Sequence, residues 1–125
     1  MMNDVSASGT VVCRLEELQD PGSRGVTVQQ GGHLYDVLVV RRGRQVFCYL
    51  NSCPHTGSPL DWMPDQFLSL DKHHIQCATH AALFRIEDGI CIAGPCSGDA
   101  LTPVPVVIDG DRVILSDHSI PAMDT

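Results

Sequence analysis

The sequence contains little positive charge, few aromatic residues and no long hydrophobic run. Its 125 residues include 8 Lys and Arg against 15 Asp and Glu, so the formal net charge is −7 at pH 7. This balance offers no basic surface that could neutralise nucleic-acid phosphates, and we expect no nucleic-acid partner. Unbroken apolar runs such as residues 37–40 are far too short to cross a bilayer, so we expect no membrane partner.

The N-terminal residues lack the charged segment and apolar stretch of a secretory signal peptide, so we expect a soluble cytoplasmic protein. The six cysteines are too sparse for a small secreted domain stabilised by disulfides. In a reducing compartment each cysteine is either a small buried apolar residue or a metal ligand. Cys13, Cys48 and Cys91 lie in apolar segments, and we expect these three to be buried.

Short segments rich in β-branched residues alternate with turn signals along the chain. Asp88-Gly89 and Asp109-Gly110 tolerate the positive φ that a two-residue hairpin turn requires. A strand about every ten residues is typical of an antiparallel sandwich or barrel. Since no repeat or linker interrupts the pattern, we predict one all-β domain. The predicted strands are residues 25–28, 35–40, 45–50, 74–77, 83–86, 90–93, 104–108 and 112–115.

One short helical turn is predicted at residues 14–20, where the segment RLEELQD is followed by Pro21-Gly22. The chain has only three Phe, two Tyr and one Trp. We therefore expect the core to consist mainly of Val, Ile, Leu and Ala.

Two segments each combine one cysteine with one histidine. The first is CPH at residues 53–55, and the second is CATH at residues 77–80. Both lie between predicted strands, and residues 56–76 separate them. Short spacings within each segment, joined by a longer interval, are typical of two loops that bind one metal centre.

The residue types are compatible with more than one kind of metal centre. A Cys₂His₂ set can hold one tetrahedral zinc ion, although zinc fingers usually pair cysteine with cysteine and histidine with histidine. Mixed pairs favour a binuclear iron–sulfur cluster in which one iron binds both thiolates and the other binds both imidazoles. Two ferric ions, two sulfides and two thiolates carry no net charge, so this cluster accepts an electron readily. A nucleophilic Cys–His pair would leave the second pair unexplained.

These motifs resemble those of Rieske-type [2Fe–2S] proteins. CPHTG and CATHAALF match the two ligand boxes of that family, and the likeness continues through EDGICIAGP and LTPVPVVIDGDRVIL, over about residues 11–115. The resemblance implies one [2Fe–2S] cluster, with Cys53 and Cys77 binding one iron and His55 and His80 binding the other. It places the chain in the soluble Rieske ferredoxin branch.

The resemblance also implies an architecture. It predicts an antiparallel Rieske-type β-sandwich or barrel base, formed by residues 1–45 and 94–125. A cluster-binding subdomain, residues 46–93, would be inserted into this base. Residues 94–96 look like the proline-containing loop that covers the cluster in the family, and we do not count Cys96 as a ligand.

Four positions distinguish the chain from the high-potential branch of the family. That branch has a disulfide at the positions of Ser58 and Thr79, and hydroxyl donors to the cluster at those of Ala82 and Phe84. Hydrogen bonds to the sulfurs favour the more negative reduced state. Their absence predicts a reduction potential at the low end of the Rieske range, on the order of −150 mV.

The implied function is that of a one-electron carrier. It would deliver electrons from an NAD(P)H-dependent flavin reductase to a terminal oxygenase, as the electron-transfer component of a dioxygenase-type oxidoreductase system and without catalytic activity of its own. Two alternatives remain at this stage, a small subunit of a nitrite-reductase-like complex and a zinc-stabilised interaction module.

The interval between the boxes is longer than in many soluble Rieske ferredoxins. Turn-rich, exposed backbone is predicted at residues 65–66 and 71–72. We expect Trp62, Met63 and Phe67 to pack beneath the ligand loops rather than to form a docking patch. We expect His73 and His74 to be exposed turn residues.

Overall fold

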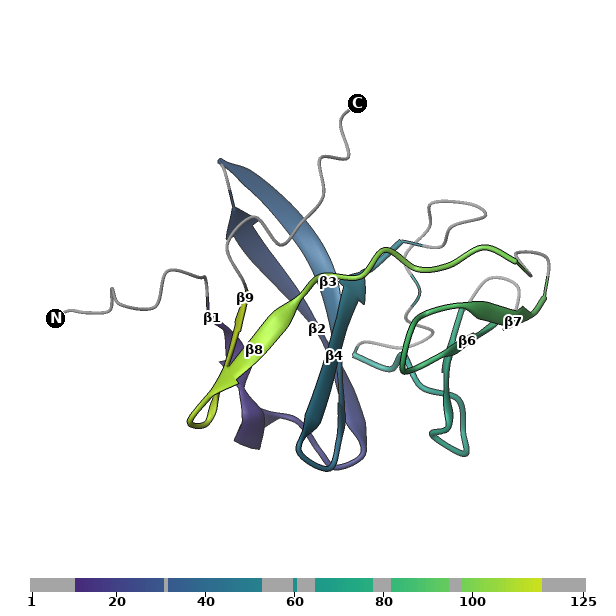
Figure 1. Cartoon of the computed structure of the whole chain (residues 1–125), viewed down its shortest axis with the longest axis horizontal. Helices are drawn as coiled ribbons and strands as arrows, with labels where there is room; N and C mark the ends of the chain where they lie inside the picture. The colour runs from purple at the N-terminus through teal and green to yellow at the C-terminus, as the bar shows by residue number, and fades with distance from the viewer. Residues whose placement is uncertain are drawn as a thin grey trace, which may run out of the picture.

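The computed structural model of the chain shows an antiparallel all-β protein (Figure 1). The residues it describes are 11–30, 32–52, 60, 65–77, 82–94 and 98–115. Their strands form three sheets of three strands each, in the orders β1-β9-β8, β2-β3-β4 and β5-β6-β7. The predicted fold class is therefore confirmed. The strands are β1 (Val11–Arg14), β2 (Gly22–Gln30), β3 (His33–Arg42), β4 (Gln45–Leu50), β5 (His74–Gln76), β6 (Leu83–Arg85), β7 (Cys91–Ala93), β8 (Val106–Asp109) and β9 (Arg112–Leu115).

All eight predicted strands are present, and β1 is an additional one. Several bounds differ from the prediction, two of them for identifiable reasons. β2 begins at Gly22, well before the predicted residue 25, because it pairs with β3 from Gly22 opposite Arg41 onwards. Pairing with a neighbour has overridden the weak strand preference of its first residues. β8 begins at Val106 rather than at residue 104. Pro105 has no amide hydrogen to donate to a sheet, so it lies just before the strand.

The predicted helical turn is present as the 3₁₀ helix η2 (Leu15–Glu17). At its start, the amide of Arg14 donates a hydrogen bond of 2.8 Å to Oε1 of Glu17. At its end, Nη1 of Arg41 donates to the carbonyl oxygens of Leu15 and Leu18, at 3.3 and 3.1 Å. The carbonyl of Leu15 also accepts from the amide of Leu18, at 3.0 Å, so the guanidinium adds a second bond there and gives the carbonyl of Leu18, just past the helix, a donor.

The sheet β2-β3-β4 lies between the other two sheets, and its central strand β3 faces two cores (Figure 1). Leu38 and Val40 belong to the core shared with the β5-β6-β7 sheet. Val37 and Val39 belong to the core shared with the β1-β9-β8 sheet. Because successive strand residues point to opposite faces, an unbroken apolar run is what a strand buried on both faces requires.

The core composition differs from the prediction in one respect. Valine and leucine dominate the described core as expected, but Ala82 is the only alanine in it. Cysteines take the small positions instead, and Cys13, Cys48 and Cys91 are buried as predicted. Burial raises the pKa of the Cys48 thiol to about 12, so this side chain remains an uncharged apolar residue.

The β5-β6-β7 sheet lies within residues 46–93, which the sequence assigns to an inserted subdomain, whereas β4 pairs with β3. The division into base and insertion stays a prediction. No helix among the described residues has the length and hydropathy needed to cross a membrane.

Replacing Gly89 by alanine is expected to lower stability strongly. Gly89 has a φ of +75°, and an added Cβ would lie 2.8 Å from Cε1 of Tyr49 and 3.2 Å from Cβ of Leu101. Left-handed backbone costs an L-residue about 1–2 kcal/mol, and overpacking adds about 1–3 kcal/mol. We expect the free energy of unfolding to fall by about 3 kcal/mol, measured by urea denaturation.

Gly110→Ala is the matched control, since Gly110 has a φ of +67° and nothing within 4 Å of an added Cβ. It should show the backbone cost alone, about 1 kcal/mol. Equal losses in the two variants would mean that the Tyr49 ring moves aside without cost.

Candidate metal centre

The described part of the chain contains one of the four predicted ligands. Cys77 directly follows β5 and is fully buried, in the same core as Ala82 and Phe84. Cys53, His55 and His80 lie outside the described residues, so their assignment as ligands stays a prediction. Among the described residues, no group of three His, Cys, Asp or Glu side chains could hold a metal ion.

The residues on either side of segment 53–59 are held together by a side chain. Oδ1 of Asn51 accepts a hydrogen bond of 2.7 Å from the amide of Leu60. The amide of Asn51 in turn donates to the carbonyl oxygen of Asp36, at 2.9 Å, which attaches it to β3. Leu60 is fully buried in the same core as Cys77. Asn51 and Leu60, on either side of the first ligand box, are therefore fixed to each other, to β3 and to the core that contains Cys77.

The second box is closed in a similar way by its backbone. The amide of Cys77 donates a hydrogen bond of 2.8 Å to the carbonyl oxygen of Ala82. Just before this point, Gln76 of β5 pairs with Leu83 of β6. Residues 78–81 therefore connect two adjacent strands, and Cys77 lies at the start of that connection.

A third segment begins directly beside the second box. Gly94 follows β7 with a φ of +103°, and a Cβ there would lie 2.8 Å from both Cα and Cβ of Ala82. Only a glycine permits this approach of the two backbones. Gly94, the first residue of the predicted covering loop 94–96, therefore lies against Ala82, which the amide of Cys77 bonds across the second ligand box, and the rest of that loop lies outside the described residues.

The surroundings of Cys77 fit the cluster that the resemblance implies. Its described core neighbours, which include Leu60, Ala82 and Phe84, are apolar. A diferric cluster with two thiolates and two neutral imidazoles has no net charge, so placing it against apolar side chains costs little. Adding an electron makes the cluster an anion, which apolar surroundings disfavour. The position of Cys77 thus fits a Rieske-type cluster, and the low potential stays a prediction.

Other predicted residues have mixed outcomes. Phe67 is fully buried in the core beside Cys77, which confirms packing rather than docking for this residue. Asp65 and Lys72 are exposed turn residues with positive φ, as expected. His73 is exposed as expected. His74 begins β5 opposite Arg85, which confirms the predicted strand, but it is half-buried, so its expected place in an exposed turn was wrong. Ser58, Trp62, Met63, Thr79 and Cys96 lie outside the described residues.

The sequence analysis missed Asn51. Its hydrogen-bond partner Leu60 is nine residues further along, beyond the reach of the local side-chain-to-backbone patterns that a sequence reveals. Gly94 was included in the covering loop, but its contact with Ala82 depends on how two distant segments meet.

Comparisons with known proteins identify the family and the fold. The family described as "Rieske [2Fe-2S] domain" matches residues 8–108. The ferredoxin of carbazole 1,9a-dioxygenase from Nocardioides aromaticivorans IC177 is similar in structure, with a TM-score of 0.68 and 25% sequence identity, over 87% of this chain and 97% of that chain. A ferredoxin from Sphingomonas yanoikuyae B1 has the same fold, with a TM-score of 0.68 and 24% identity, over 88% of this chain and 99% of that chain.

No curated protein matches the sequence at a significant level. The family match nevertheless covers most of the chain, and the similar solved structures are Rieske-type ferredoxins. The chain therefore belongs to the Rieske [2Fe-2S] domain family, and its cofactor is a [2Fe–2S] cluster.

Proposed function

We propose that the protein is a cytoplasmic one-electron carrier that receives electrons from an NAD(P)H-dependent flavin reductase and delivers them to a terminal oxygenase. The bound cluster supplies reversible one-electron chemistry. The observation that carries the proposal is the likeness to the ferredoxin of carbazole 1,9a-dioxygenase, which extends over 97% of that chain. Another similar structure is a complex of oxygenase and ferredoxin in the same dioxygenase, so a carrier of this fold associates with an oxygenase there.

We further propose that Cys53 and Cys77 bind one iron and that His55 and His80 bind the other. The buried thiol of Cys77 supports this assignment, as do the closures at Asn51–Leu60 and Cys77–Ala82. Leu60 and Ala82, the described residues that follow the two boxes, belong to the core that contains Cys77. Cys13, Cys48, Cys77 and Cys91, the cysteines in the described part of the chain, form no disulfide bonds, as expected for a protein that works in a reducing compartment.

The net charge of −7 suggests how partners are recognised. An acidic carrier is attracted to a basic surface around the redox centre of its partner, and such attraction mainly accelerates association. Small transient interfaces of this kind are typical of electron-transfer pairs.

The proposal is tested by purification followed by rapid mixing. We expect a coloured protein with visible absorption and, once reduced, the EPR signal of a Rieske cluster. Reduced protein should transfer one electron to a terminal oxygenase, with a second-order rate constant that falls as salt increases, because ions screen the attraction.

Two results would contradict the proposal. Stable co-purification with one large partner would indicate a fixed subunit of a complex rather than a free carrier. A colourless protein that contains zinc would indicate an interaction module.

A further inference from the structure

The interval between the two ligand boxes contains a hairpin that ends at Cys77. Residues 65–77, called here the 65–77 hairpin, fold back on themselves, with Leu68 paired to Ile75. The amide of Gln76 donates a hydrogen bond of 2.8 Å to the carbonyl oxygen of Phe67. One arm of the hairpin therefore leads directly into Cys77, and the position of the other arm determines where this arm lies.

The other arm is attached to β2 by hydrogen bonds across 40 or more residues of sequence. Oγ of Ser23 donates to the carbonyl oxygen of Asp65 at 2.8 Å and accepts from the amide of Phe67 at 3.1 Å. Oδ1 of Asp65 accepts from the amide of Gly25 at 2.9 Å. β2 is an edge strand, so these bonds satisfy a strand amide that its own sheet leaves unpaired.

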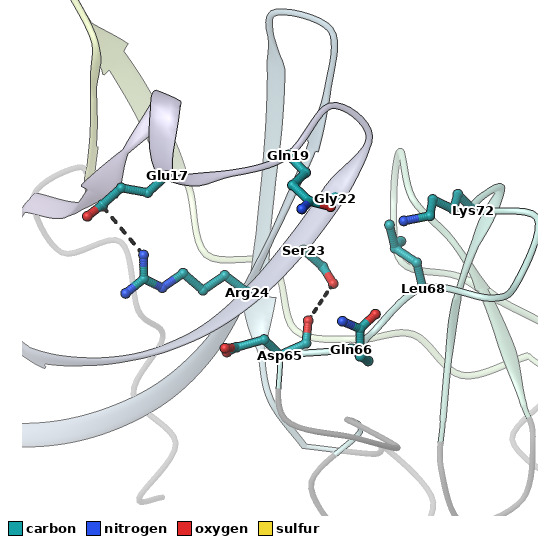
Figure 2. A pocket seen from close by; sticks show the side chains of 9 residues that line it. All are labelled: Glu17, Gln19, Gly22, Ser23, Arg24, Asp65, Gln66, Leu68 and Lys72. Carbon is teal, nitrogen blue, oxygen red and sulfur yellow. Dashed lines mark hydrogen bonds and ion pairs between the residues drawn. The ribbon is translucent and has the colours of Figure 1, made fainter.

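The 65–77 hairpin packs closely against β2, along a contact called here the seam. A Cβ at Gly25 would lie 3.3 Å from Cζ of Phe67, so the ring rests against bare backbone. An open polar cleft of about 280 Å³ runs beside the seam. Figure 2 shows Ser23 directed toward Asp65 at the cleft, whereas Arg24 is directed to Glu17, with which it forms an ion pair of 3.6 Å. That ion pair does not join the hairpin to β2.

We propose that Ser23 is a positioning residue for the second ligand box. Its hydroxyl, as donor and acceptor at once, fixes Asp65 and Phe67 against β2. Phe67 then holds Gln76, the residue before Cys77. The inference rests on the proposed ligand role of Cys77. It implies that the hairpin between the two boxes attaches that ligand to the central sheet.

The test compares Ser23→Ala with Thr27→Ala in the cluster-loaded protein. Thr27 lies on the same strand, and its hydroxyl donates to Asp36 of β3, at 2.8 Å, within the central sheet. Hydrogen exchange at the amides of Phe67 and Gln76 should become about tenfold faster in Ser23→Ala, since one buried amide loses its acceptor and the hairpin opens more often. Loss of visible absorption to a chelator should accelerate in parallel. Thr27→Ala should change neither rate, and Ser23→Thr, which keeps the hydroxyl, should restore both.

Unchanged exchange at Phe67 and Gln76 in Ser23→Ala, or equal acceleration in Thr27→Ala, would overturn the proposal while the proposed function stands. A wild-type protein without iron would contradict the proposed function itself and remove the ligand role on which the proposal rests. Hydrogen exchange is measured at the amides of Phe67 and Gln76 in the variants, whereas iron content is measured in the wild-type protein. The two failures are therefore distinguishable.

Discussion

Replacing Cys77 by serine is expected to abolish the visible absorption of the purified protein and the EPR signal of its reduced form. A serine hydroxyl is a poor ligand for the iron that prefers thiolates, and the fully buried side chain has no route to an alternative partner in solvent. We expect iron content to fall to a small fraction of the wild-type value, measured by elemental analysis and absorbance on equal amounts of protein.

Cys91→Ser is the matched control for this substitution. Cys91 is also buried, in the same core, but it lies on β7 and its Sγ donates to the carbonyl oxygen of Ala93, at 3.2 Å. A serine hydroxyl can make that bond too. This variant should keep its cluster with at most a modest loss of stability. If Cys77→Ser retained full iron and an unchanged spectrum, the proposed ligand set would be wrong.

The second large effect concerns the reduction potential, which we expect to be on the order of −150 mV in the wild-type protein. Replacing Phe84 by tyrosine is expected to raise this potential by about 40 mV, because a hydroxyl donor stabilises the reduced cluster more than the oxidised one. A hydrogen bond of about 1 kcal/mol shifts the equilibrium about fivefold, and a tenfold shift in a one-electron equilibrium is about 59 mV. Phe84 is fully buried in the core that contains Cys77, which is why a hydroxyl added there meets the site rather than solvent. A redox titration followed by absorbance or EPR measures the change.

Phe47→Tyr provides the comparison for this titration. Phe47 lies on β4, packs at the margin of the same core and is only partly buried, so its new hydroxyl reaches water. The reduction potential of the Phe47→Tyr variant should equal that of the wild-type protein. A clearly positive midpoint in the wild-type protein would contradict the low-potential assignment, and a Phe84→Tyr variant with an unshifted midpoint would show that this position does not face the cluster.

Much of the fold was predictable because its signals are local. Runs of β-branched residues predicted strands that the structure confirms, and the glycines at 89 and 110 have the positive φ that their turns require. The start of β2 and the partial burial of His74 were not predictable in this way. Both depend on a partner strand, which lies elsewhere in the sequence.

By itself, the sequence determined the chemistry of this protein. Two boxes of cysteine and histidine identify a Rieske family member and predict its thiolate and imidazole ligands, and apolar residues at 82 and 84 predict a site that lacks two of the family's hydroxyl donors, since residue type and spacing are properties of neighbouring residues. Only the tertiary structure decided how the described residues beside those boxes are held. The contacts of Asn51 with Leu60, Gly94 with Ala82 and Ser23 with Asp65 join residues that are separated along the chain. Such contacts depend on where the folded backbone brings the chain together, and no local pattern in the sequence encodes that meeting.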